Sequence, residues 1–300
     1  MKSYLRNTAA AVALLAGATA ADAGQLYLSI FGGATWGSDL DPVTSGGGTV
    51  NSSRTVQVTH LNPAPHPHTL AFVFTAVTNF TMTGADADTG FVVGATVGRE
   101  YDNIMPGLRA EFELSFRRNK YGVATLSGGG TDSDTASSAF SPGGNISYPA
   151  GVTPLAPLVP VGPGVVNAPV AGTYTFAANF ATNFTVADEG NVQTWALMAN
   201  VWWDLTNDSD FTPYIGGGVG YAISKFDGGA VYDGVDGNFA WQLGAGINVA
   251  ISEETSLGVG YRYFDAGDVT LTLPTPAGTP TTAEQDVRGS AVLLQLTTKL

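Results

Sequence analysis

Two glutamates, Glu111 and Glu113, are the residues whose types and spacing come nearest to acid–base chemistry in this chain. Paired carboxylates can exchange protons with a substrate if a pocket admits one, but the sequence around them indicates none. Arginines share their side of the segment, and a charged group buried in a protein must be paired to be tolerated. We therefore predict an ion-pair network, with an ion path gated by exchange of pairs as the alternative. Its predicted members lie on the polar sides of alternating segments: Arg109, Glu111, Glu113, Arg117, Asp204, Arg262 and Lys299.

The three histidines of the chain, His60, His66 and His68, lie close together in a single connection. Histidine-rich tracts can bind transition metals, but prolines hold this segment extended and no carboxylate is adjacent, so we expect a solvated loop. A hydrolase would need a nucleophile with a histidine base in reach, and no histidine lies on a predicted strand. We predict no catalytic residue, no metal site and no cofactor.

Segments in which apolar and polar residues alternate predict eight β-strands. The clearest is residues 108–117, where Phe112, Leu114 and Phe116 alternate with the charged residues of the predicted network. A period of two is typical of a strand with two different faces. The predicted strands span residues 26–36, 90–98, 108–117, 194–204, 213–225, 239–251, 257–263 and 292–299.

The connections between these strands alternate in length. Long or intermediate connections (residues 37–89, 122–193, 226–237 and 266–288) are separated by short turns, as in outer-membrane barrels with extracellular loops and periplasmic turns. The connections are rich in Gly, Ser, Thr and Pro, a composition that predicts mobile loops. Residues 70–82 and 174–186 alternate, and we interpret them as strand extensions above the membrane. The alternative is a ten-stranded barrel.

Composition narrows the class of protein further. Lys2 and Arg6, an apolar run and small residues up to Ala23 predict a signal peptide over residues 1–23, and residues 24–300 would form one barrel domain. The chain has no cysteine, so thiolate metal sites and disulfides are excluded. Its formal net charge of −13 argues against nucleic acid as a partner.

The faces of the strands favour a membrane barrel over a soluble sandwich. Charged residues make up only 12% of the chain, and glycines crowd the polar faces, which suits the narrow interior of a small barrel. Aromatic residues gather toward strand ends, where membrane interfaces are expected: Trp36, Trp195, Trp202, Trp203, Tyr214 and Tyr263. The fold class we predict is all-β, an eight-stranded antiparallel up-and-down transmembrane barrel.

Residues 90–102 (GFVVGATVGREYD) and 108–114 (LRAEFEL) resemble the second and third strands of the small opacity-like and OmpA-like outer-membrane barrels. Residues 197–204, 211–220 and 257–265 resemble the strands that follow. The resemblance implies a place in the outer membrane, insertion by the barrel assembly machinery, and a role as surface antigen, adhesin or envelope-stabilising protein. The chain departs from the family by ending in Leu300 rather than an aromatic residue.

We therefore predict a non-enzymatic surface barrel with a structural, adhesive or antigenic role, whose loops meet a host or cell-surface ligand. A narrow passive channel for small solutes is the alternative, and a lipid-modifying enzyme is a third possibility. Three cations at lipid-facing rim positions could meet lipopolysaccharide phosphates, with extension into water as the simpler interpretation: Arg118, Lys120 and Lys225.

Overall fold

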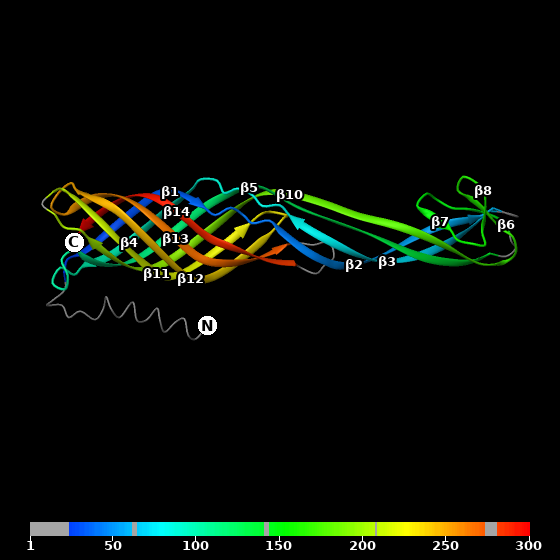
Figure 1. Cartoon of the computed structure of the whole chain (residues 1–300), viewed down its shortest axis with the longest axis horizontal. Helices are drawn as coiled ribbons and strands as arrows, with labels where there is room; N and C mark the ends of the chain where they lie inside the picture. Colours follow the sequence, from blue (N-terminus) through cyan, green and yellow to red (C-terminus); the bar gives the residue numbers. More distant parts are fainter. Residues whose placement is uncertain (1–23, 62–64, 141–143, 208, 274–280) are drawn as a thin grey trace.

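The computed structural model describes residues 24–61, 65–140, 144–207, 209–273 and 281–300. Within them, eight antiparallel strands form a closed ring, so the predicted barrel is confirmed (Figure 1). The first and last strands pair with each other, which leaves no open sheet edge in the hydrocarbon. In ring order the strands are β1 (Leu26–Gly37), β4 (Gly90–Glu100), β5 (Leu108–Phe140), β10 (Gly172–Asp204), β11 (Phe211–Asp227), β12 (Asp233–Ala250), β13 (Thr255–Leu273) and β14 (Thr281–Lys299).

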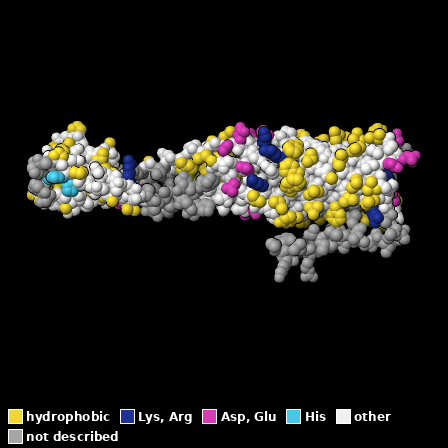
Figure 2. All heavy atoms as spheres, turned by 180° about the vertical axis from the view of Figure 1, so that it is seen from behind, with side chains coloured by type: hydrophobic (Ala, Val, Ile, Leu, Met, Phe, Trp, Pro, Cys, Tyr) yellow, Lys and Arg dark blue, Asp and Glu magenta, His cyan; other side chains and the backbone are white. Residues whose placement is uncertain are grey.

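Apolar side chains point outward from the ring. Leu114, Leu197 and Leu294 are each more than half exposed, and yellow apolar atoms cover much of the barrel wall (Figure 2). The charged residues of β5 point inward instead. This direction excludes a soluble sandwich, in which the apolar faces would meet in a core. No helix of the described residues is long and apolar enough to cross a membrane.

The aromatic residues divide between the two faces of the barrel wall. Trp36, Trp195 and Trp203 are about half exposed on the outside, as a membrane girdle requires. The prediction was wrong for Trp202 and Tyr214, which are buried in the lumen with ring centroids 5.6 Å apart. Both residues lie on the same inward face of their strands as Asp204, because successive side chains of a strand point to opposite faces.

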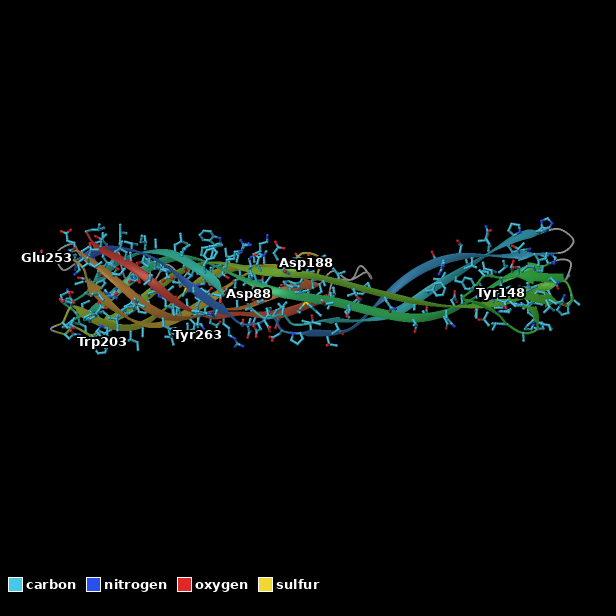
Figure 3. The ribbon with its side chains drawn as sticks, turned by 90° about the horizontal axis from the view of Figure 1, so that it is seen from above. Asp88, Tyr148, Asp188, Trp203, Glu253 and Tyr263 are labelled. Carbon is cyan, nitrogen blue, oxygen red and sulfur yellow. The ribbon has the colours of Figure 1, made fainter. Side chains whose placement is uncertain are left out.

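The short turns and the long connections lie at opposite ends of the ring. Trp203 and Glu253 mark the end with the short turns, and Tyr148 lies at the far end of the long connections (Figure 3). Short turns face the periplasm in outer-membrane barrels. Strand β1 begins and β14 ends at the same periplasmic end.

The described residues of the long connections lie mostly in strands, so the prediction of irregular loops over residues 37–89 and 122–193 was wrong. Strands β5 and β10 continue as one ribbon far beyond the barrel, from Leu108–Trp203 at one end to Phe140–Gly172 at the other. A hairpin of β2 (Val43–His60) and β3 (His66–Met82) runs beside this ribbon. We call the two ribbons together the stalk. Residues 70–82 and 174–186 lie in β3 and β10, outside the ring, as the strand-extension interpretation requires.

The far end of the stalk carries a small folded unit, which we call the tip (the described residues of 55–74 and 135–178). It contains the ends of the stalk strands and four short strands: β6 (Gly144–Ser147), β7 (Val152–Pro154), β8 (Val159–Gly162) and β9 (Val165–Ala168). The tip has its own apolar core, which includes Phe72, Phe140, Ile146, Val166 and Phe176. This core supplies the burial that composition alone did not indicate.

A second apolar core closes the outer end of the barrel. We call it the outer plug, and it includes Phe80, Tyr121, Met198, Phe226 and Phe264. The shorter connections also hold more strand than predicted. Only residues 228–232 separate β11 from β12, and β13 and β14 extend into the predicted loop 266–288. The predicted signal peptide, residues 1–23, lies outside the described residues.

Candidate functional site

The lumen of the barrel is lined by alternate residues of β5, because successive side chains of a strand point to opposite faces. Arg109, Glu111, Glu113 and Arg117 all point inward, and none is more than 8% exposed. Glycines on facing strands make room for the larger side chains. A Cβ at Gly98 would overlap the ring of Tyr27.

Near the periplasmic end, Arg109 lies at the centre of a cluster of polar side chains. Its guanidinium is 2.7 Å from the carboxylate of Asp204 and 3.1 Å from that of Glu111. The hydroxyl of Tyr27 donates to Glu111 at 2.9 Å. Lys299 does not join this cluster but pairs with Glu100 at 3.0 Å. Glu100 is not among the predicted members of the network, although the alternation of β4, continued by two residues beyond the predicted strand, places it in the lumen.

Deeper in the lumen, Glu113 is the centre of a second cluster and has no exposed surface. It forms an ion pair with Arg262. Asn200 and Gln242 donate to the same carboxylate oxygen at 2.9 and 3.0 Å. Neither amide was singled out in the sequence, because an uncharged polar residue on an inward face gives no signal of its partner across the barrel.

Arg117 lies two inward-facing positions beyond Glu113 on β5 and has a different environment. Its guanidinium carbon is 3.7 Å from the ring centroid of Phe264, and it donates to Gln242 at 3.5 Å. Among the described residues, no carboxylate lies within ion-pair distance of Arg117. Cation–π contact and the nearby negative charge of Glu113 therefore stabilise this arginine.

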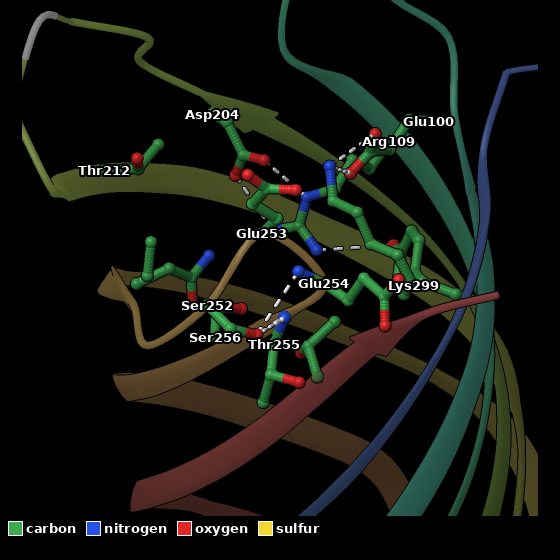
Figure 4. A pocket seen from close by; sticks show the side chains of 14 residues that line it. Glu100, Arg109, Asp204, Thr212, Ser252, Glu253, Glu254, Thr255, Ser256 and Lys299 are labelled. Atoms are coloured by element: carbon green, nitrogen blue, oxygen red, sulfur yellow. Dashed lines mark hydrogen bonds and ion pairs between the residues drawn. The ribbon is translucent and has the colours of Figure 1, made fainter.

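A cavity of about 210 Å³ opens at the periplasmic mouth (Figure 4). Arg109, Asp204, Glu100 and Lys299 line it together with Glu253 of the β12–β13 turn. Its inner wall is the Arg109 cluster, and the Glu113 cluster and the outer plug lie beyond it. A smaller cavity of about 30 Å³ adjoins Arg117, Tyr121 and Phe264.

The outer plug contains two tyrosines that face acidic residues above the membrane. Burial, followed by the charges of Asp227 and Asp188, raises the pKa of Tyr232 to about 12. Burial also raises the pKa of Tyr121 well above its ordinary value. Both phenols therefore stay neutral at physiological pH, and the plug remains an uncharged seal.

The three rim cations lie on the outside of the barrel at its outer end. Arg118 and Lys225 face the same residue of β10, Gln193, from either side. Strands are about 4.8 Å apart, so the two backbones are about 10 Å apart. Lys120 lies two residues further out on β5, and Lys225 approaches Asp227 at 4.0 Å. The structure thus brings these cations together on one side of the rim.

The histidines lie in the tip, far from the charged lumen. His60 is buried beside Phe140, and the Nδ1 atom of His68 is 3.1 Å from the hydroxyl of Ser138. Burial, followed by the charges of His60 and His66, lowers the pKa of His68. A serine–histidine pair needs a third group to orient the base, and residues 42–85 and 135–187 contain no carboxylate. Among the described residues, no group of three or more His, Asp or Glu side chains is placed to bind a metal.

Comparison with protein families agrees with this geometry. The model of the outer membrane protein beta-barrel domain matches residues 120–297. The chain belongs to this family. It is an outer-membrane β-barrel protein of the Gram-negative cell envelope, and the resemblance seen in the sequence is confirmed.

Individual relatives match over shorter stretches. The outer membrane protein PagN of Salmonella typhimurium (strain LT2) is 31% identical over 104 residues, which cover 32% of this chain and 44% of PagN. An uncharacterized protein of Brucella abortus (strain 2308) is 33% identical over 90 residues, covering 26% of this chain and 32% of its own length. The chain thus matches under half the length of these relatives. Neisserial surface protein A is 12% identical with a TM-score of 0.40, covering 92% of this chain and 97% of its own.

Proposed function

We propose that the protein is a non-enzymatic surface barrel that holds a folded tip away from the outer membrane for adhesive or antigenic contacts. One observation carries the proposal: the long connections fold into a stalk and a tip that has its own apolar core. Ordering so many residues costs conformational entropy. A structured tip therefore favours a role in specific contact over that of a passive loop.

The interior of the barrel supports a holding role rather than transport. Side chains of the two charged clusters lie in the lumen, and the outer plug covers its outer end. Eight-stranded barrels are narrow enough for side chains to fill them. A passive channel would need both layers to move aside together.

The stalk gives the tip considerable reach. From Lys120 at the rim to Phe140 in the tip, β5 runs for 20 residues, and strands rise about 3.3 Å per residue. The tip is therefore on the order of 65 Å beyond the rim. The rim cations lie at the base of the stalk, where contact with lipopolysaccharide phosphates would hold it in position.

The test is a variant without the tip. Ser53 faces Val73 and Ser133 faces Asn179 across their ribbons, so a two-residue turn can close each ribbon at that level. We expect the variant to keep the heat-modifiable gel migration of a folded barrel while cells that display it lose retention on host-cell surfaces. Retention equal to that of the full-length protein would overturn the proposal.

Conductance provides a second test, on the purified full chain in planar bilayers. A filled lumen predicts no discrete openings. Regular openings of the wild-type protein would favour the passive channel instead.

A further inference from the structure

The charges of the chain are distributed very unevenly along the molecule. Residues 55–74 and 135–178, which include the tip, contain no Asp, Glu, Lys or Arg, and histidines are their only basic side chains. The whole formal charge of −13 therefore lies outside the tip. In Figure 2 the carboxylates crowd the two ends of the barrel, whereas the tip is mostly white, yellow and cyan.

The surface of the uncharged tip exposes aliphatic side chains. Val159 and Val161 of β8 are 53% and 55% exposed, and Leu155 lies just before them. We call these three side chains with their strand the β8 patch. All four residues of β8 are exposed, and among the described residues the strand is hydrogen-bonded on one side only, to β9.

We propose that the β8 patch binds the β8 patch of a second copy of this chain, so that tips on two facing membranes adhere to each other. The inference rests on the proposed function and names one partner of the tip, which the host-cell test does not involve. The tip is the most distant part of the molecule from the membrane, so it is the first part that copies on facing membranes bring together. An aliphatic patch without charges can be self-complementary about a twofold axis.

Charge explains why the contact is confined to the tips. The bodies of two copies carry net negative charge and repel each other. Burying one of their carboxylates in an interface would be costly unless a cation paired with it. Two tips meet without either cost.

Other partners fit the tip less well. Interfacial binding to lipid relies on exposed Trp or Tyr and on basic residues. The tip has no Lys, Arg or Trp, and of its two tyrosines Tyr174 is buried and Tyr148 is partly buried against the tip core. Recognition of sulfated or phosphorylated ligands uses arginine clusters, which the tip also lacks. Pro160 lies in the middle of β8, and because proline has no backbone N–H it disfavours the addition of another strand to this edge. The contact is therefore made by side chains.

The experiment uses the full chain reconstituted into two populations of lipid vesicles that carry different dyes, with clustering measured by fluorescence cross-correlation. We expect clustering when both populations carry the wild-type protein and none when one population is protein-free. Val159→Asp with Val161→Asp should reduce clustering at least about tenfold, because two carboxylates enter the contact. The matched control adds the same charges to the exposed stalk, Thr131→Asp with Ser133→Asp, and should cluster like wild type.

A pair of variants with opposite charges distinguishes loss of the contact from misfolding of the tip. Vesicles with V159D/V161D and vesicles with V159K/V161K should each fail to cluster alone but should cluster when mixed, because opposite charges then face each other. Three results would overturn the inference: no wild-type clustering, clustering with protein-free vesicles, or no recovery in the mixture. Loss of this contact alone, with tip-dependent retention on host cells intact, would leave the proposed function standing.

Discussion

Replacing Glu113 with Gln is the most direct perturbation of the lumen. The carboxylate has no exposed surface, pairs with Arg262 and accepts hydrogen bonds from Asn200 and Gln242. Glutamine keeps the shape of the Glu113 side chain but removes its negative charge. Its NH₂ group is a donor and cannot accept the hydrogen bonds that the carboxylate accepts. Removal of one partner from a buried ion pair costs about 3–5 kcal/mol, because the other charge stays buried without compensation.

The measurement is the free energy of unfolding in urea, with the barrel folded in lipid vesicles. The exposed Glu253→Gln serves as the control and should leave the midpoint unchanged. Arg262→Met should be similarly destabilising alone, and the double variant E113Q/R262M should cost about 0.5–3 kcal/mol less than the sum of the two. Equal midpoints for E113Q and wild type, or strictly additive costs, would refute the view that this pair holds the lumen together.

Three further outcomes are expected. Gly98→Ala should lower the free energy of unfolding by about 1–3 kcal/mol, since the new methyl group overlaps the Tyr27 ring. Gly32→Ala is the control, because the nearest atom to its added methyl group is 3.6 Å away. Equal urea midpoints for the two variants would contradict the prediction. The pKa of Tyr232 is raised to about 12 in the folded state and is about 10 in the unfolded chain, so the stability that its neutral form contributes is complete below pH 10 and is lost as the pH rises toward 12. Tyr232→Phe should therefore make the urea midpoint fall less steeply between pH 10 and pH 12. An unchanged dependence of the midpoint on pH would contradict this prediction. Replacing the rim cations Arg118, Lys120 and Lys225 with Ala should lower both the co-purification of lipopolysaccharide and the thermal stability of the barrel. Unchanged values of both would refute the proposed contact.

The barrel could be predicted from the sequence because side-chain direction along a strand alternates whatever the surroundings. Phe112, Leu114 and Phe116 indicate a lipid-facing side, and their charged neighbours indicate the lumen. The same parity would have placed Trp202 beside Asp204 inside the barrel. The tendency of aromatic residues to lie at membrane interfaces pointed the other way, and strand parity prevailed.

The members of the charged clusters could be predicted from parity, but their pairing could not. Glu113 and Arg262 lie on β5 and β13, which are not neighbours in the ring. Their contact crosses the lumen, and its partners depend on the stagger of the closed barrel. Lys299 pairs with Glu100 and Arg117 contacts Phe264 for the same reason.

The sequence by itself determined the class of fold, the number of ring strands and the face each side chain presents, since all three follow from a local period of two. Only the tertiary structure decided that the long connections form a stalk and a tip. Their composition is that of loops, and the contacts that order them join distant segments, such as Asn79 with Gly129 and Thr59 with Ser147. The tip core is assembled from residues between Val58 and Ala178. Apolar residues scattered over such a distance bury one another only after the chain has folded. The local alternation of residues 70–82 and 174–186 indicates strands but not the partners against which they are buried.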